Sequence, residues 1–405
     1  MNAPLRQPLD PGADAFALVS HDGSAATVDK HRKTRTERVD VPAGETPFGA
    51  RLDSQRRRGR GAAVNPAGRY EPTATEAVDD GWESLGELPA LKTEVRLESP
   101  RSVLTRNESP DIGFDRSINP YRGCEHGCVY CFARPSHAYL GLSPGLDFET
   151  RLTAKPGAAA VLERELAKPR YQPKTIAIGT NTDPYQPIER EYKITREILE
   201  VLDRTNHPVG IVTKSALVLR DIDILERMAK RGLVKVAISV TTLDRKLARA
   251  MEPRAATPEK RIATLEALSA AGIPTSVMVA PIVPALNDAE IDTILERAAA
   301  AGVKEAGYIL LRLPLEVTDV FKDWLLRNYP DRYRRVLSII RAMRGGKDYD
   351  ATFGKRMKGE GPYAWTLGRR FELAAKRNRL NLERSRLRTD LFVPPLGDGC
   401  QLSLF

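Results

Sequence analysis

The sequence predicts an α/β fold in which parallel strands alternate with crossover helices and curl into a partial, open barrel. Short β-branched runs alternate with helical patterns between about residues 115 and 315. This alternation supplies about six strand–helix units, fewer than the eight of a complete barrel. An apolar fraction of 41% over 405 residues is enough to furnish a sizeable core, which excludes a fully disordered protein.

The strand–helix series begins with a strand near Ile118 and continues in order along the chain. The predicted elements are strand 175–178 and helix 194–202, strand 209–213 and helix 221–231, strand 234–240 and helix 258–271, strand 276–280 and helix 288–301, and a closing strand 307–311. Gly232 and Gly272 follow two of these helices directly, where a left-handed residue is typical. Thr257 is predicted to cap the helix that begins at Pro258, because threonine is a common capping residue and proline is common in the first helical turn.

The strand–helix series lies in a central part, residues 101–315. The segments before and after it lack this alternation. Residues 1–100 predict a mostly irregular basic arm, because periodic apolar runs are scarce there. Its run from Arg56 to Gly61, RRRGRG, fits either a solvated linker or a basic strap that touches phosphates or the domain surface. Residues 316–393 predict a basic helical extension, with helices at 320–329, 332–343 and 363–381. The last of these fits an amphipathic helix packed on the barrel with a solvated face.

Charge and cysteine usage limit the class of protein. A formal net charge of +10 favours polyanionic partners, nucleic acid above all. No run of about 18 apolar residues occurs and the beginning of the chain lacks an apolar stretch, so we expect no membrane span, no secretion signal and a cytoplasmic location. Three of the four cysteines are clustered, which indicates metal or redox chemistry in a reducing compartment.

The clustered cysteines are Cys124, Cys128 and Cys131, in a C-x₃-C-x₂-C spacing. Thiolates at such spacing let one loop wrap a single iron–sulfur cluster, and Gly123 and Gly127 permit the tight turns required. Three thiolates leave one iron of a cubane without a protein ligand, which suits a cluster that binds substrate. The alternatives are an electron carrier and a structural zinc site, whose fourth ligand would have to be His126, His137 or Cys400, none at an expected spacing.

At these residues the chain resembles the radical S-adenosylmethionine (SAM) superfamily. The resemblance implies a partial (β/α)6 barrel of the radical SAM type and a [4Fe–4S] cluster held by Cys124, Cys128 and Cys131. It also implies reductive cleavage of SAM to a 5′-deoxyadenosyl radical, with an electron donor such as flavodoxin or ferredoxin. Tyr130 occupies the aromatic position that borders the adenine in this superfamily; plain packing is the alternative.

Within the superfamily the chain is most similar to the spore photoproduct lyase branch of DNA repair enzymes. The similarity lies in the runs 180–189, 213–215, 238–243, 251–254 and 272–282. Lys214 and Arg254 are candidate cations for the SAM carboxylate, Ser239 is a candidate for its amino-acid or ribose end, and Asn181 and Asp183 are candidates for its amino group or ribose hydroxyls. Surface ion pairs for Lys214 and Arg254, and a simple turn at Asp183, are the alternatives.

One position departs from that branch. Spore photoproduct lyase has a cysteine hydrogen donor where this chain has Thr180, and a hydroxyl gives up hydrogen poorly. Cys400 is the remaining thiol and lies far away in sequence. A substrate other than the spore photoproduct is therefore expected.

The terminal residues Gln401–Phe405, QLSLF, resemble the pentapeptide with which bacterial DNA-processing proteins dock on the sliding clamp. Residues 394–405 contain two prolines and are predicted to be a flexible tail, which suits docking; an apolar tail packed on its own domain is the alternative.

Three functions follow from these observations. The leading hypothesis is a lyase-like radical SAM enzyme acting on nucleic acid. The alternatives are the same chemistry on a protein or small molecule, and a non-enzymatic iron–sulfur protein that binds DNA or the clamp.

Overall fold

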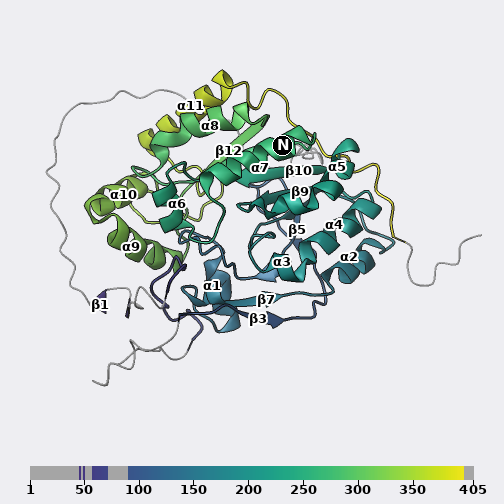
Figure 1. Ribbon diagram of the computed structural model, residues 1–405. Coiled ribbons are helices and arrows are strands. Elements are labelled where there is room, and N and C mark those ends of the chain that lie inside the picture. Colours follow the sequence, from purple (N-terminus) through teal and green to yellow (C-terminus); the bar gives the residue numbers. More distant parts are fainter. Residues whose placement is uncertain (1–44, 47–48, 51–56, 72–89, 396–405) are drawn as a thin grey trace, which may run out of the picture.

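The computed structural model describes residues 45–46, 49–50, 57–71 and 90–395. Within these residues the chain forms a seven-stranded sheet of order β12-β11-β10-β9-β8-β5-β4, parallel throughout except between β4 and β5. The strands are β4 (Thr105–Arg106), β5 (Arg116–Ile118), β8 (Ile176–Ile178), β9 (Val209–Thr213), β10 (Val234–Ser239), β11 (Thr275–Ile282) and β12 (Glu305–Leu310). Helices cover the outer side of the sheet (Figure 1). The predicted α/β partial barrel is confirmed.

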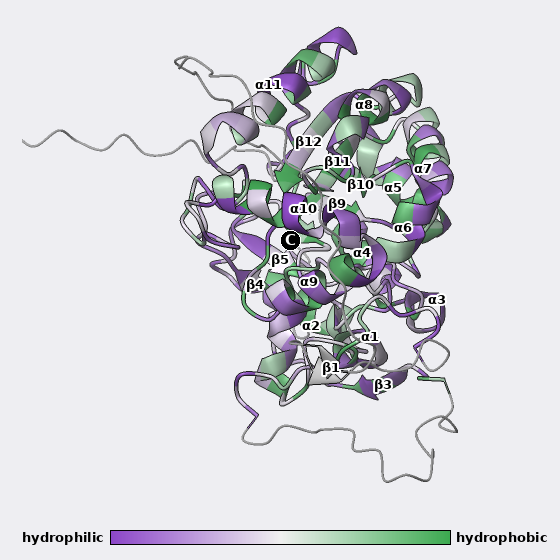
Figure 2. Ribbon diagram, turned by 90° about the vertical axis from the view of Figure 1, so that its left-hand side faces the viewer, coloured by the Kyte–Doolittle hydropathy of each residue, from purple (hydrophilic) through white to green (hydrophobic). Residues whose placement is uncertain are grey.

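The strands carry continuous apolar runs because both faces of the sheet are buried. Ile176, Ile211, Val236 and Val277 are all fully buried in one core cluster. The crossover helices are α4 (Ile194–Arg204), α5 (Ile222–Lys230), α7 (Pro258–Ala270) and α8 (Ile291–Ala300). Figure 2 shows hydrophilic residues on α7 and α11 (Gly361–Arg377), while Leu367, Phe371 and Ala374 of α11 are buried in the core.

The predicted helix ends are also confirmed. The Thr257 hydroxyl accepts a hydrogen bond from the backbone NH of Lys260 at 3.4 Å, as a helix cap does. Gly232 and Gly272 adopt φ values of 69° and 74°, the left-handed conformation that a helix end favours. Short 3₁₀ segments, η3 (Ala216–Asp221) and η4 (Asp288–Glu290), precede α5 and α8.

A second, three-stranded sheet was not predicted from the sequence. It has the order β3-β7-β6 and consists of β3 (Glu94–Leu97), β7 (Arg151–Ala154) and β6 (Tyr121–Arg122). These strands are only two to four residues long, and three of the four β3 residues are exposed, so the alternation of polar and apolar residues in EVRL and RLTA is too brief to mark them as strands. Further elements missed were the edge strand β4, α1 (Asp147–Thr150), α2 (Ala158–Leu166), α3 (Glu189–Tyr192), α6 (Arg245–Met251), the 3₁₀ segment η2 (Arg134–Leu140) and the pair β1 (Glu45–Thr46) and β2 (Gly49–Ala50).

The basic run of the N-terminal arm packs into the domain. Arg60 is 5% exposed, and the residues from Gly61 to Val64 are buried. The guanidinium of Arg60 donates to the backbone oxygens of Glu149 and Leu91 at 2.9 and 3.1 Å. The interpretation as a solvated linker is therefore wrong for Arg60 and Gly61, which pack against the domain as part of a strap formed by residues 57–71.

The predicted C-terminal helices are present as α9 (Val317–Asn328), α10 (Pro330–Ala342) and α11. Helix α11 lies against α8 (Figure 1), and its Arg370 and Arg377 form ion pairs with Asp292 of that helix. The Phe371 ring lies 4.7 Å from the Tyr308 ring of β12. The prediction of an amphipathic helix packed on the barrel is confirmed.

The chain after α11 crosses the amino ends of the sheet strands. Backbone NH groups of Asn381, Arg388 and Val393 donate to the carbonyls of residues 304, 232 and 205, which lie one, two and four residues before β12, β10 and β9. In Figure 1 this yellow segment passes α5 and α4. In the part of the chain that the structure describes, no helix is both long and apolar enough to cross a bilayer.

The ion pair between Arg134 and Glu149 is completely buried, and Glu149 also accepts hydrogen bonds from the backbone NH groups of Gly61 and Ala62 at 2.8 and 2.9 Å. Glu149→Ala should lower the free energy of unfolding by about 3–5 kcal/mol, because it leaves the guanidinium buried without its partner. Urea unfolding followed by circular dichroism measures the change. Glu94, 73% exposed and 4.0 Å from Arg151, gives the matched control. Glu94→Ala should change stability by at most about 1 kcal/mol. Equal effects of Glu149→Ala and Glu94→Ala would contradict the conclusion that the buried ion pair with Arg134 stabilises the fold.

Candidate active site

The three clustered cysteines lie in the loop between β6 and η2. Cys124 and Cys128 are each 8% exposed, Cys131 is half-buried, and all three thiols are free. The backbone NH of Cys131 donates to the Cys128 carbonyl at 3.2 Å, which closes a turn between the second and third cysteine. The loop therefore presents three free thiols within one short stretch of backbone.

Glycines in the cysteine loop allow the N-terminal strap and Glu149 to pack closely against its backbone. Gly123 and Gly127 have φ values of 73° and 68°, as the motif predicts. Gly61 of the N-terminal strap lies so close that a Cβ atom there would be 2.0 Å from the Gly127 carbonyl oxygen. A Cβ on Gly127 would lie 2.7 Å from the Glu149 carboxylate. The strap and Glu149 thus fix the backbone between the first two cysteines.

The donor set fits a cluster better than a single metal ion. Among the described residues, no three His, Cys, Asp or Glu side chains converge closely enough to hold one metal ion. A cubane takes each thiolate on a different iron, so it requires sulfur atoms farther apart than a mononuclear zinc site does. Soft thiolates without an oxygen or imidazole ligand at the expected fourth position also favour iron–sulfur chemistry.

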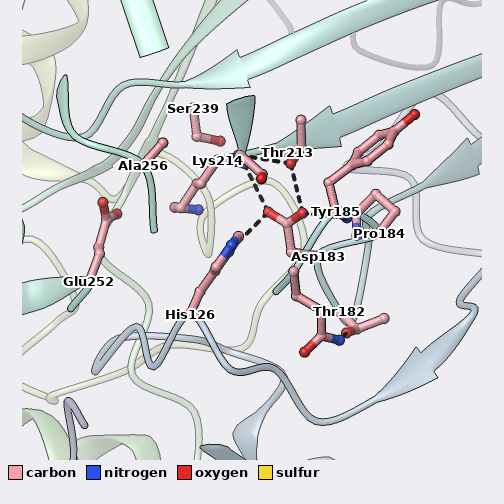
Figure 3. Close-up of polar contacts among 12 residues, drawn as sticks. His126, Thr182, Asp183, Pro184, Tyr185, Thr213, Lys214, Ser239, Glu252 and Ala256 are labelled. Atoms are coloured by element: carbon pink, nitrogen blue, oxygen red, sulfur yellow. Dashed lines mark hydrogen bonds and ion pairs between the residues drawn. The ribbon is translucent and has the colours of Figure 1, made fainter. Parts of the chain in front are cut away.

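Asp183 joins the cysteine loop to the neighbouring strand end (Figure 3). One carboxylate oxygen accepts from the Thr213 hydroxyl at 2.7 Å and the backbone NH of Tyr185 at 2.9 Å. The other accepts from the backbone NH of Lys214 at 2.8 Å and lies 3.3 Å from Nδ1 of His126. Burial disfavours the charged form, but His126 and these hydrogen bonds outweigh it and lower the pKa of Asp183 to about 2. Asp183 therefore positions the loop with oxygens that are already occupied by protein donors.

A second buried network surrounds Glu252, which follows α6. The carboxylate accepts from the hydroxyls of Tyr130 and Thr241 and forms an ion pair with Arg261. Burial raises the pKa of Glu252, but Arg261 and Lys214 overcome that effect and the net shift is downward. Sequence reasoning missed Arg261, because nothing in its helix distinguishes an inward-facing arginine from a solvated one. Tyr130 is thus anchored at its hydroxyl, with its ring left to border the site.

Lys214 provides an unpaired cation. Its ammonium nitrogen lies 5.7 Å from the centroid of the Tyr130 ring and forms no hydrogen bond or ion pair with the described residues. Burial disfavours its charged form, yet the nearby Cys128 and Glu252 raise the pKa of Lys214 above its ordinary value. In Figure 3 its side chain extends between Ser239 and Glu252. A protonated ammonium without a partner beside the cysteine loop can bind an anionic ligand.

Some of the other predicted site residues have polar groups that are available to a ligand, and others are already bound to protein groups. Ser239, the last residue of β10, is 3% exposed, and its hydroxyl has no hydrogen-bond partner among the described residues. Asn181 is exposed, and the Asn119 side chain accepts from its backbone NH at 2.9 Å. Arg254 forms an ion pair with Glu125 of the cysteine loop at 3.1 Å. Lys214 and Ser239 are therefore free to bind a ligand, whereas Arg254, like Asp183, braces the loop.

Cys400 and the predicted clamp-docking pentapeptide Gln401–Phe405 lie outside the described residues. Thr180, at the position of the missing thiol, donates its hydroxyl hydrogen to the Asn119 side chain at 3.1 Å.

Comparisons with known proteins agree with this geometry. The family model described as the Radical SAM superfamily matches residues 118–298, which include the cysteine loop and the sheet from β5 to β11. An uncharacterized protein of Mycobacterium tuberculosis is 40% identical over 232 residues, which are 57% of this chain and 68% of that protein. An uncharacterized protein of Methanocaldococcus jannaschii is 31% identical over 219 residues, 53% of this chain and 77% of that protein.

Solved structures show the same fold at low sequence identity. A spore photoproduct lyase mutant with bound AdoMet and dinucleoside spore photoproduct has a TM-score of 0.52 and 16% identity, over 70% of this chain and 78% of that one. A second mutant of that lyase has a TM-score of 0.52 and 14% identity, over 76% of this chain and 86% of that one. Because the matching family model contains the three-cysteine loop, and because close relatives are covered over more than two thirds of their length, this chain belongs to the radical SAM superfamily.

Proposed function

We propose that this chain is a radical SAM enzyme that cleaves SAM reductively and acts on nucleic acid, with a [4Fe–4S] cluster on Cys124, Cys128 and Cys131. The observation that carries the proposal is the unpaired ammonium of Lys214, which lies beside Cys128 at the carboxyl ends of the parallel strands. When bound, the cluster and SAM supply a 5′-deoxyadenosyl radical, which abstracts hydrogen from a substrate.

The residues of the chain bind and orient the cofactor. Lys214 pairs with the SAM carboxylate and Ser239 donates to the amino-acid or ribose end. The ring of Tyr130, fixed by its hydrogen bond to Glu252, borders the adenine. Asn181 binds the amino group or the ribose hydroxyls of SAM in this proposal. Asp183 and Arg254 position the loop through His126 and Glu125.

A nucleic-acid substrate is supported by the net charge of +10 and by the fold shared with a lyase that binds a dinucleoside photoproduct. The Thr180 hydroxyl in place of a thiol argues for a lesion or modified base other than the spore photoproduct. Radical chemistry on a protein or small molecule is the alternative, and salt-dependent DNA binding separates the two. A cytoplasmic location suits free thiols and an electron donor such as flavodoxin or ferredoxin.

Anaerobic reconstitution with iron and sulfide should give about four irons per chain. Replacing Cys124, Cys128 or Cys131 with Ala should remove the cluster and abolish formation of 5′-deoxyadenosine from SAM and dithionite. Iron and sulfide analysis and chromatography of the nucleoside check both results. Cys400→Ala is the matched control and should keep the cluster. One zinc per chain without sulfide would sink the proposal.

Lys214→Ala and Ser239→Ala should each retain the cluster but weaken SAM binding by roughly 10- to 150-fold, the effect of losing one charge-assisted hydrogen bond. Equilibrium binding to the reconstituted protein measures the change. Lys230, 71% exposed on the outer helix α5, serves as control, and Lys230→Ala should leave SAM affinity unchanged. Unaltered affinity in both site variants would remove Lys214 and Ser239 from the cofactor site.

A further inference from the structure

Two stacks of arginine on aromatic rings lie at the two ends of the segment 312–316, which follows β12. At one end, the Arg312 guanidinium lies 4.8 Å from the centroid of Phe132, the residue directly after Cys131. At the other end, Glu316 accepts hydrogen bonds from Arg69 of the N-terminal strap at 2.9 and 3.1 Å.

The second stack contains two tyrosines. The Arg69 guanidinium lies 4.9 Å from the Tyr70 ring and 5.1 Å from the ring of Tyr139 in η2, and the two rings are 5.2 Å apart. Three residues lie between Arg312 and Glu316, a span of at most about 14 Å. Each stack also contains a ring from the stretch 132–140, which directly follows Cys131.

The charge of Arg312 is not neutralised by protein. It forms no ion pair with the described residues, and its buried Nε has no hydrogen-bond partner. Its one hydrogen bond goes to the Tyr349 hydroxyl at 3.4 Å. Arg344, 2% exposed, donates to the backbone oxygens of Lys355 and Leu311 at 2.7 and 3.1 Å, and within the described part of the chain it forms no ion pair with a carboxylate. Desolvated cations without a counter-ion call for an anion.

The aromatic rings are unusually open to solvent. Phe132 is 42% exposed, Tyr70 is 58% exposed and Tyr139 is 71% exposed. Aromatic faces interleaved with arginines are the means by which proteins bind single-stranded nucleic acid, because every base offers a π-face and every linkage a phosphate. An acidic peptide would satisfy the arginines but leave the aromatic faces unused.

We propose that these residues form a path for a single strand of nucleic acid. Arg312 binds a phosphate beside the cysteine loop, Phe132 stacks on the adjoining base, and the stack of Tyr70, Arg69 and Tyr139 holds a second base farther along. The path rests on the proposed function, since it leads a nucleotide to the site where SAM is bound. The path also explains why Arg312, which lies against Phe132 beside the cysteine loop, forms no ion pair with a carboxylate of the described residues.

The test uses the reconstituted full-length protein and a fluorescent oligothymidylate of about ten nucleotides, a length within the range of known single-strand sites. Anisotropy is measured over a series of salt concentrations. Arg312→Ala should weaken binding by roughly 10- to 150-fold and lower the slope of log K against log salt by about 0.7, the loss of one phosphate contact on a single strand. Arg312→Lys should retain the slope while binding more weakly, because a lysine keeps the charge but not the planar contact.

Tyr139→Ala should weaken binding by roughly 5- to 150-fold without changing the salt slope, because stacking releases no counter-ion. Arg297, exposed on the outer helix α8, is the matched control, and Arg297→Ala should change neither quantity. Thermal unfolding and iron content should be the same in all variants.

The strand path is overturned if Arg312→Ala and Arg297→Ala have equal effects, or if polyglutamate competes as well as an oligonucleotide of equal charge. A protein that cleaves SAM but does not bind the oligonucleotide also overturns the path, while the radical chemistry stands. A protein that binds the oligonucleotide through Arg312 and Tyr139 but does not cleave SAM overturns the proposed function and leaves the path intact.

Discussion

The carboxylate of Glu149 accepts from Arg134 and from the backbone of Gly61 and Ala62, and these contacts connect three separate parts of the chain around the cysteine loop. Arg134 follows the cysteines, Glu149 belongs to the short helix before β7, and the two backbone groups belong to the N-terminal strap. A buried carboxylate is stable only if its lone pairs are filled, so each of these segments must be in place for the others to pack. The N-terminal strap is thus part of the site rather than an appendage, although it lies far from the cysteines in sequence.

Asp183 has a comparable role on the other side of the loop. Its contacts with His126, Thr213 and the Lys214 backbone tie the loop to the ends of two strands. The Lys214 backbone is held, while its ammonium group forms no hydrogen bond or ion pair with the residues that the structure describes. The side chain can therefore be used for ligand binding without disturbing the fold. Asp183, whose carboxylate oxygens accept hydrogen bonds from the protein, positions the loop, whereas the ammonium group of Lys214 remains available to bind a ligand.

The parallel sheet and its crossover helices could be predicted because buried strands leave uninterrupted apolar runs and helix ends have local signals, such as Thr257 and Gly272. The cysteine loop could be located because its spacing is itself the signal. The small sheet of β3, β7 and β6 could not be predicted, since strands of two to four residues are too short for their alternation to be recognised. Nor could the partners of Arg254 and Asp183, because Glu125 and His126 meet them only through the tertiary fold. Arg312 belongs to no sequence motif, and its contact with the Phe132 ring appears only in the tertiary fold.

The segment from Asn381 to Val393 runs across the amino ends of the strands, while the cysteines, Lys214 and Ser239 lie at the carboxyl ends. The two ends of the sheet therefore have different tasks. Backbone hydrogen bonds from this segment close the amino ends, while the carboxyl ends carry the polar side chains that are left for a ligand.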